Sequence, residues 1–372
     1  MKTILIYIFL FMASVVAYGQ KIMLGSCVLK DGGMYKGEMV AGKAHGKGSA
    51  TYKNGDMYEG EYVKGKRQGY GVYTFVDGER YEGEWFQDQQ HGKGTYYFMN
   101  NNKYVGLWFR DYQQGHGVMY YYNGDMYDGQ WYMDKRQGKG KYVFASGAFY
   151  DGEWKNDMKH GKGHYDWGDG SYYDGQWSQN QRSGKGTYRY ADGDVYTGFW
   201  ADDIQNGRGV YKYANHDVYE GSYVQGERHG EGIFRFANGD VYTGHFANGE
   251  KNGHGVLVWR NGDSYDGFWK NDKYEGRGVL KKKDGDTFEG TFKNGKMNGE
   301  MIIHFSNGTK FKGMYRNGKP DGKAIEQDKD GVRFEGSYRN GVRHGEYVMK
   351  NRDGQVTETG VYVDGFKEKT KK

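Results

Sequence analysis

One strict repeat dominates this chain of 372 residues. An aromatic residue followed two positions later by Gly recurs every 23 residues, from Tyr35 to Phe334, in 14 copies without an insertion. With this aromatic residue counted as position 1, positions 3 and 12 are Gly in all 14 copies, and position 5 is aromatic in 13. Such fixed self-similarity indicates a solenoid or array in which each unit contacts its neighbours.

The composition excludes several other architectures. Gly accounts for 65 residues and aromatic residues for 17%, whereas the chain has one Pro and one Cys. An interior Gly costs a helix roughly 1 kcal/mol relative to Ala, which excludes an ordinary helical domain. Collagen needs Pro, and a disulfide framework or a Cys-based zinc cluster needs several Cys. We therefore expect ordered structure built from Tyr, Trp and Gly.

Within one unit, aromatic residues and Gly alternate with other residues over 58–62 and 69–75, which predicts two strands. Asn-Gly or Asp-Gly at positions 20 and 21 predicts a tight turn into the next unit. A three-residue loop at 76–78 would place Tyr73 opposite Tyr81 and gather every aromatic residue and Gly on one face. Rings could then lie flat over bare Gly backbone.

The opposite face is predicted to be charged. Positions 2 and 4 are often acidic, as in Glu59 and Glu61, and position 13 is often basic, as in Lys47 and Lys93. Cross-strand pairs of these residues would contribute about 0.2 to 1 kcal/mol each. The simplest interpretation is a solvated, neutralised surface.

The pattern Tyr58-x-Gly60-x-Tyr62, continued by Gly69-x-Gly71, resembles the MORN (membrane occupation and recognition nexus) repeat. The resemblance covers roughly residues 22 to 365. It implies an all-β fold, an elongated single-layer twisted antiparallel sheet of tandem β-hairpins, roughly 130 Å long at about 4.8 Å per strand. Members of this family tether membranes, organise cytoskeletal or ciliary assemblies, or serve as appendages to kinases and methyltransferases. We expect no appended enzyme domain in this chain.

The chain is predicted to have four parts. Residues 1–19 combine a charged start, an apolar run and small residues near a plausible cleavage site, which is the layout of a secretory signal peptide. Residues 20–34 form a truncated leading repeat, residues 35–356 the fourteen repeats, and residues 357–372 a partial repeat with a basic tail. We therefore expect an exported protein that is secreted, periplasmic or associated with the cell envelope.

Two other interpretations of the N-terminus stay open. The apolar run could be retained as an anchor. Alternatively, Leu24-Gly25-Ser26-Cys27 resembles the box at which bacterial lipoproteins are lipidated on Cys. Because Cys27 falls in phase with position 16 of the repeat, a strand-packing role is the stronger expectation.

The last three repeats diverge from the others. Phe replaces the leading Tyr, and Met301, Ala324 and Tyr347 replace Gly at position 14. Terminal repeats are expected to cap an open sheet edge. Docking to a partner, or to a second copy as a homodimer through terminal repeats, is the alternative.

We expect no catalytic, cofactor-binding or metal-binding residue, and no cofactor. Five of the eleven His residues occupy position 11 and follow the repeat. Residues 273–372 hold 22 Lys and Arg against 15 Asp and Glu, a net charge of +7. Nucleic-acid binding is not expected, because the rest of the chain is neutral to acidic. Anionic lipid is the possible ligand of the basic residues. These candidates are Lys281, Lys282, Lys283, Lys367 and Lys369.

A row of Trp at position 5 could bind glycans if the rings are exposed. The row consists of Trp85, Trp108, Trp131, Trp154, Trp177 and Trp200. The sequence thus favours a non-enzymatic scaffold that presents an extended surface to proteins at the cell envelope or outside the cell. A module binding phospholipid at a membrane surface and a glycan-binding protein are the alternatives.

Overall fold

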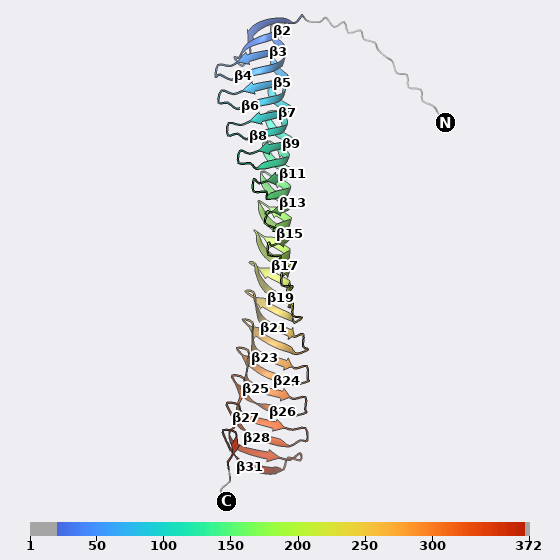
Figure 1. The fold of residues 1–372 in the computed structure, drawn as a ribbon, viewed down its shortest axis with the longest axis vertical. Coiled ribbons are helices and arrows are strands. Elements are labelled where there is room, and N and C mark those ends of the chain that lie inside the picture. Colours follow the sequence, from blue (N-terminus) through green and yellow to red (C-terminus); the bar gives the residue numbers. More distant parts are fainter. Residues whose placement is uncertain (1–20, 369–372) are drawn as a thin grey trace, which may run out of the picture. The chain divides into compact units, whose positions relative to one another are not determined.

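The computed structural model describes residues 21–368, which contain strands and turns but no helix. The predicted signal peptide and the candidate lipid contact Lys369 lie outside these residues. The chain divides into two compact units, Met1–Met158 and Lys159–Lys372, and the division falls inside the sixth repeat. Within each unit, consecutive strands pair antiparallel (Figure 1), except that β29 and β30 both pair with β28. The all-β class and the tandem hairpins predicted from the sequence are confirmed.

Unit 1 contains twelve strands and the first residue of a thirteenth. The strands are β1 (Met23–Val28), β2 (Met34–Val40), β3 (Lys43–Thr51), β4 (Met57–Val63), β5 (Lys66–Thr74), β6 (Arg80–Phe86), β7 (Gln89–Tyr97), β8 (Lys103–Phe109), β9 (Tyr112–Tyr120), β10 (Met126–Tyr132), β11 (Lys135–Val143) and β12 (Phe149–Lys155). A seven-residue strand and a nine-residue strand alternate from β2 onwards.

Unit 2 begins inside β13 and continues the same alternation as far as β28. Its strands are β13 (Met158–Asp166), β14 (Tyr172–Ser178), β15 (Gln181–Arg189), β16 (Val195–Ala201), β17 (Ile204–Lys212), β18 (Val218–Val224), β19 (Glu227–Arg235), β20 (Val241–Ala247), β21 (Glu250–Val258), β22 (Ser264–Lys270), β23 (Lys273–Lys281), β24 (Thr287–Lys293), β25 (Lys296–His304), β26 (Lys310–Arg316), β27 (Lys319–Gln327), β28 (Arg333–Arg339), β29 (Val342–Arg343), β30 (Gly345–Lys350), β31 (Val356–Val363) and β32 (Phe366–Lys367).

The turn between repeats has the predicted three-residue loop. Tyr73 pairs with Tyr81 and Gly71 with Gly83, which is the pairing that places the aromatic residues and Gly of both strands on one face. Phe75 donates its N–H to the Glu79 carbonyl, which closes the loop at 76–78. Position 21 has a positive φ even where Gly is replaced, by Asn101 at 64° and His216 at 74°. Asn and His tolerate this left-handed conformation better than most residues.

A second turn, inside each repeat, was not predicted. Positions 7 and 8 both have positive φ, for example Gln87 at 50° and Asp88 at 71°, and they join two strands that pair directly on either side. Two consecutive left-handed residues define the type I′ hairpin, whose twist matches that of the strands. Position 12 Gly, for example Gly69 with φ of 73°, is left-handed beside a register shift, which explains why this position is Gly in every copy.

Candidate protein-binding surface

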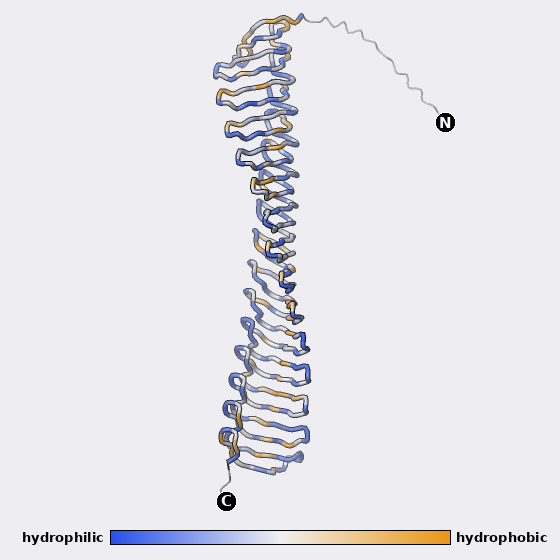
Figure 2. The backbone as a smooth tube through the Cα atoms, in the orientation of Figure 1, coloured by the Kyte–Doolittle hydropathy of each residue, from blue (hydrophilic) through white to orange (hydrophobic). Residues whose placement is uncertain are grey.

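The sheet in each unit has two chemically different faces. We call the face carrying positions 1, 3, 5, 14 and 16 the ring face, and the face carrying positions 2, 4, 13 and 15 the outer face. Figure 2 shows hydrophobic and hydrophilic residues succeeding one another along the strands. The ring face holds the buried aromatic side chains, and the outer face is the side available for contacts.

On the ring face, Tyr at position 1 lies over Gly. The Tyr81 side chain is fully buried, and a Cβ added at Gly94 would lie 2.6 Å from its Cζ. Its hydroxyl donates to the Glu84 carbonyl at 2.9 Å. The bond recurs in each repeat that begins with Tyr, as in Tyr104 to the Leu107 carbonyl at 3.0 Å. Strand glycines are therefore covered by rings, as the sequence predicted.

The Trp side chains at position 5 belong to the same buried ladder. Trp131 donates its indole N–H to the Gly117 carbonyl at 3.0 Å. Its ring meets Tyr127 edge to face, with centroids 5.2 Å apart, and Tyr104 with centroids 5.4 Å apart. Such edge-to-face pairs add about 0.5 to 1.5 kcal/mol beyond the burial of area.

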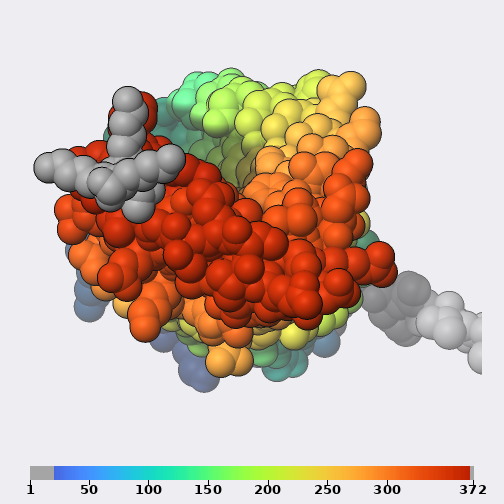
Figure 3. Space-filling model, turned by 90° about the horizontal axis from the view of Figure 1, so that it is seen from below, coloured from blue at the N-terminus to red at the C-terminus, as the bar shows by residue number. Residues whose placement is uncertain are grey.

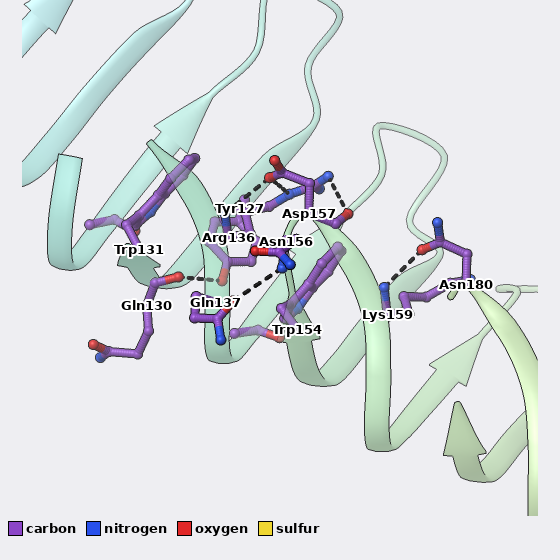
Figure 4. A network of polar contacts seen from close by, with 12 residues as sticks. Tyr127, Gln130, Trp131, Arg136, Gln137, Trp154, Asn156, Asp157, Lys159 and Asn180 are labelled. Carbon is purple, nitrogen blue, oxygen red and sulfur yellow. Dashed lines mark hydrogen bonds and ion pairs between the residues drawn. The ribbon is translucent and has the colours of Figure 1, made fainter. Parts of the chain in front are cut away.

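A cation and a turn residue cover several of the Trp rings from the open side, whereas Gln90 and Gln113 take the place of the cation next to Trp108 and Trp131. Arg136 places its Cζ 4.3 Å from the centroid of the Trp154 ring (Figure 4). Asp157, in the type I′ turn beside Trp154, accepts hydrogen bonds from the Arg136 backbone N–H at 3.0 Å and from Nε at 3.1 Å. Unit 2 repeats the motif with Arg182, Asp203 and the ring of Trp200. At the start of unit 2, Lys159 donates its backbone N–H to Asn180 (Figure 4).

The Trp row is therefore not an exposed binding surface. Its six members, Trp85, Trp108, Trp131, Trp154, Trp177 and Trp200, are only 4–6% exposed. The glycan alternative required exposed rings, so its condition is not met. A period-two pattern cannot reveal this, because the covering residues at positions 8 and 10 come from different repeats.

The basic residues are not gathered at one place. Lys281, Lys282 and Lys283 lie at the end of β23 and in the loop that follows, whereas Lys367 lies in β32, with β24 to β31 in between. The Lys282 ammonium is 2.7 Å from Asp263, and the Lys367 ammonium is 2.6 Å from Glu358. Lys281 and Lys283 are exposed.

The outer face of unit 1 has Glu at position 4 in four of its six repeats. Glu38 accepts a hydrogen bond from the Lys47 N–H at 2.9 Å, beside the left-handed Gly46, and Glu84 accepts one from the Lys93 N–H. The predicted register holds, since Lys47 lies opposite Glu61. Ion pairs on this face include His116 with Asp128, at 2.8 Å.

The outer face of unit 2 is aliphatic at position 15. Seven consecutive repeats place Val or Ile there, all half-buried, and we call this set the aliphatic row. Its members are Val210, Ile233, Val256, Val279, Ile302, Ile325 and Val348. Position 4 adds Phe199, Phe268 and Met314, which are 41–48% exposed. No sequence prediction identified this row, although reading position 15 down the repeats would have found it.

Two grooves follow the aliphatic row. One, of about 970 Å³, extends from Lys185 to Val256 and includes Phe199, Val210 and Ile233. The other, of about 670 Å³, is lined by Met314, Ile325 and charged residues. Figure 3 shows the molecule hollowed between residues coloured green to orange. Charged groups such as Arg208, Glu220 and Glu231 border the apolar floor.

Other chemistry is not visible in the described part of the chain. No group of three or more His, Cys, Asp or Glu residues among 21–368 is arranged to hold a metal ion. No helix in that range is long and apolar enough to cross a membrane.

These features define a tandem β-hairpin repeat protein with a buried aromatic ladder and a variable second face. Fourteen consecutive matches to the MORN repeat cover residues 35–354, and the chain belongs to the MORN repeat family. The resemblance inferred from the sequence is thereby confirmed. MORN repeats form a non-catalytic scaffold.

Other comparisons add little. No curated protein sequence matches the chain. Among solved structures, the TCP10 domain of CPAP from Danio rerio is similar at 14% identity and a TM-score of 0.31, over 59% of this chain and 98% of that chain. The TCP domain of SAS-4 (dCPAP) from Drosophila melanogaster, in complex with a proline-rich motif of Ana2 (dSTIL), is similar at 17% identity and a TM-score of 0.23, over 48% and 84%. A catalytically inactive virginiamycin B lyase from Staphylococcus aureus reaches 12% identity and 0.13, over 77% and 92%. These scores are too low to support an argument about this chain.

Proposed function

We propose that the protein is a non-enzymatic scaffold that binds protein segments along the outer face of unit 2. The aliphatic row carries this proposal, because half-buried Val and Ile side chains from seven consecutive repeats line one face, where the exposed Phe199, Phe268 and Met314 extend the apolar surface. Contiguous exposed apolar surface in a soluble domain marks an interaction site. The backbone of the sheet is already paired, so the grooves offer apolar contacts to side chains of the ligand.

A random linear peptide library displayed on phage, selected against the intact protein, tests the proposal. Ile233→Thr with Val256→Thr should weaken the selected peptides by about tenfold or more, since each lost methylene contact is worth about 0.8 kcal/mol. Thr keeps the β-branched shape and already occupies position 15 as Thr187. The matched control, Val72→Thr with Val118→Thr, changes the same position in unit 1 and should alter binding less than twofold.

Equal weakening by the two variants would contradict the proposal, as would peptides whose binding neither variant affects. The intact array must be used, since neighbouring repeats stabilise one another. A circular dichroism spectrum of each variant verifies that the sheet is retained.

For the location, we propose the cell envelope or the outside of the cell, on the basis of the sequence of residues 1–19. N-terminal sequencing of protein recovered from the producing cell tests it. A mature N-terminus near residue 20 and recovery outside the cytoplasm are expected. An intact Met1 in cytoplasmic protein would contradict export.

Membrane-surface binding is the alternative function, supported by the exposed Lys281 and Lys283. Liposomes of neutral lipid with and without an added anionic phospholipid separate the two. Flotation that needs anionic lipid and is lost in Lys281→Glu with Lys283→Glu would favour the membrane. The scaffold proposal expects no flotation with either lipid.

A further inference from the structure

The first strand of the described chain, β1, and its last two strands, β31 and β32, are complementary parts of one repeat. β1 pairs with β2 through Gly25 opposite Gly37 and Cys27 opposite Tyr35. This is the register in which positions 14 and 16 of a complete repeat meet positions 3 and 1 of the next one. β1 is therefore a second-half strand, covering positions 12 to 17.

At the other end, β31 is a first-half strand. It pairs with β30 through Gly360 opposite Tyr347 and Tyr362 opposite Gly345, which assigns Gly360 to position 3 and Tyr362 to position 5. The pairing of Tyr362 with Lys367 repeats that of Trp85 with Gln90. β31 and β32 thus supply positions 1 to 6, 9 and 10.

The flanking sequence does not carry the missing halves. Before β1, position 3 of the repeat would fall on Ser14, where all 14 complete copies have Gly. After β32, position 12 would fall on Lys369, where all 14 copies have Gly, and that Gly is left-handed. A residue with a side chain is strained in that conformation.

Both strands also leave apolar side chains uncovered. Leu24 in β1 is 85% exposed and Phe366 in β32 is 80% exposed. Charged residues, Pro and β-bulges usually protect an edge strand from pairing with another chain. β1 contains no charged residue and no Pro, and its pairing with β2 has no register shift. Among the described strands, β2 is the partner of β1, and the other edge of β1 carries no pairing.

We propose that β1 of one copy pairs with β31 of a second copy, head to tail, so that the two partial units complete one repeat across the joint. In the register of a complete repeat, Gly25 lies opposite Gly360 and Cys27 opposite Glu358. β32 ends at position 10 and β1 starts at position 12, so the two strands follow each other without overlap. Such a heterologous joint does not close, and it generates a linear series of oligomers.

A disulfide designed across the joint tests the proposal. Cys27 is the one Cys of the chain. Glu358→Cys would place a second thiol opposite it, at a cross-strand spacing that suits a disulfide. The purified full chain carrying this substitution, mildly oxidised, should give a ladder of dimers, trimers and longer species on a non-reducing gel. Adding Cys27→Ser should abolish the ladder.

Other outcomes overturn the head-to-tail joint. A dimer of the unsubstituted chain through Cys27 would indicate pairing between two copies of β1. A dimer of Glu358→Cys that survives Cys27→Ser would indicate pairing between two C-terminal ends. The control Thr359→Cys lies one residue away and faces the other side of β31, so an equal ladder there would show non-specific collision. Monomers at every concentration in sedimentation velocity, without a ladder, would also contradict the proposal.

Discussion

The two units share one ring face but differ on the outer face. Tyr127 in unit 1 and Tyr219 in unit 2 are both fully buried, and each donates to the carbonyl three residues later. In contrast, position 4 changes from carboxylates such as Glu61 to Phe268 and Met314, and position 15 is aliphatic in every repeat from Val210 to Val348. The comparison indicates that the ring face carries the fold, whereas the outer face can vary without disturbing it.

The largest expected effect separates repeats that begin with Tyr from those that begin with Phe. Burial is the main cause that raises the pKa of Tyr35 to about 12, and it raises the pKa of Tyr58 and Tyr219. A raised tyrosine pKa contributes stability that is fully present below about pH 10 and is lost as the pH rises through the folded value. All six repeats that begin in unit 1 should therefore open at high pH.

In unit 2, the last three repeats begin with Phe288, Phe311 and Phe334 and lack a titrating position 1. Burial also raises the pKa of Tyr315 and Tyr338 in repeats 13 and 14, so only repeat 12 is free of the effect. Hydroxyl-radical footprinting between pH 9 and 12.5, read by mass spectrometry, should show exposure of unit 1 and the Tyr repeats of unit 2 before repeat 12, which contains no Tyr. Simultaneous opening of all repeats would show that the ionisation of these Tyr side chains does not determine alkaline stability.

The next effect contrasts the faces of one strand. Gly94→Val should reduce the local stability of β6 and β7 by about 2 to 3 kcal/mol, because the new side chain overlaps the Tyr81 ring. Thr95→Val, the adjacent outer-face position, should change it by less than about 0.5 kcal/mol. Native-state hydrogen exchange of the β6 and β7 amides measures both. Equal losses of local stability in the two variants would contradict the claim that the ring face, and not the outer face, stabilises the fold.

A smaller effect tests why Tyr gives way to Phe near the C-terminal end. Tyr81→Phe removes the bond to the Glu84 carbonyl and should cost about 1 kcal/mol by hydrogen exchange. Phe288→Tyr should bring no gain, because the fully buried Met301 occupies position 14, where Gly lets the Tyr ring lie flat. A gain of similar size in repeat 12 would contradict this explanation.

The smallest effect concerns stability on the outer face. Val72→Thr in unit 1 and Ile233→Thr in unit 2 should each change local stability by less than about 1 kcal/mol, because both side chains are partly exposed and Thr suits a strand. Only the second should affect ligand binding. Chemical denaturation followed by circular dichroism provides the check, and a large loss in either variant would assign these residues to the fold.

The sequence predicted how neighbouring repeats pair, because the length of the loop decides which side chains share a face of the sheet. Only a three-residue loop at 76–78 sets Tyr73 opposite Tyr81, and the structure has that pairing. The type I′ turn was missed because residues such as Gln87 and Asp88 are not its usual residues, although Asn294-Gly295 in a later repeat is a clear signal.

The surface was harder to predict than the fold. Period two identifies two faces but does not say which is covered, and Trp154 is buried by Arg136 from the preceding repeat. The aliphatic row is dispersed at one residue per 23, so each of its members looks like an ordinary strand residue in its own repeat. The register of strand pairing decides which side chains of different repeats contact and bury one another, and this register is known from the structure.

Photo-crosslinking at matched positions tests the central claim most directly. Val256 in unit 2 and Val72 in unit 1, both at position 15, are replaced one at a time by photoreactive benzoylphenylalanine, and a biotinylated peptide selected against the intact protein is added. We predict strong crosslinking at Val256, little at Val72, and competition by the unlabelled peptide. Equal crosslinking at the two positions, or stronger crosslinking at Val72, would contradict the assignment of binding to the outer face of unit 2.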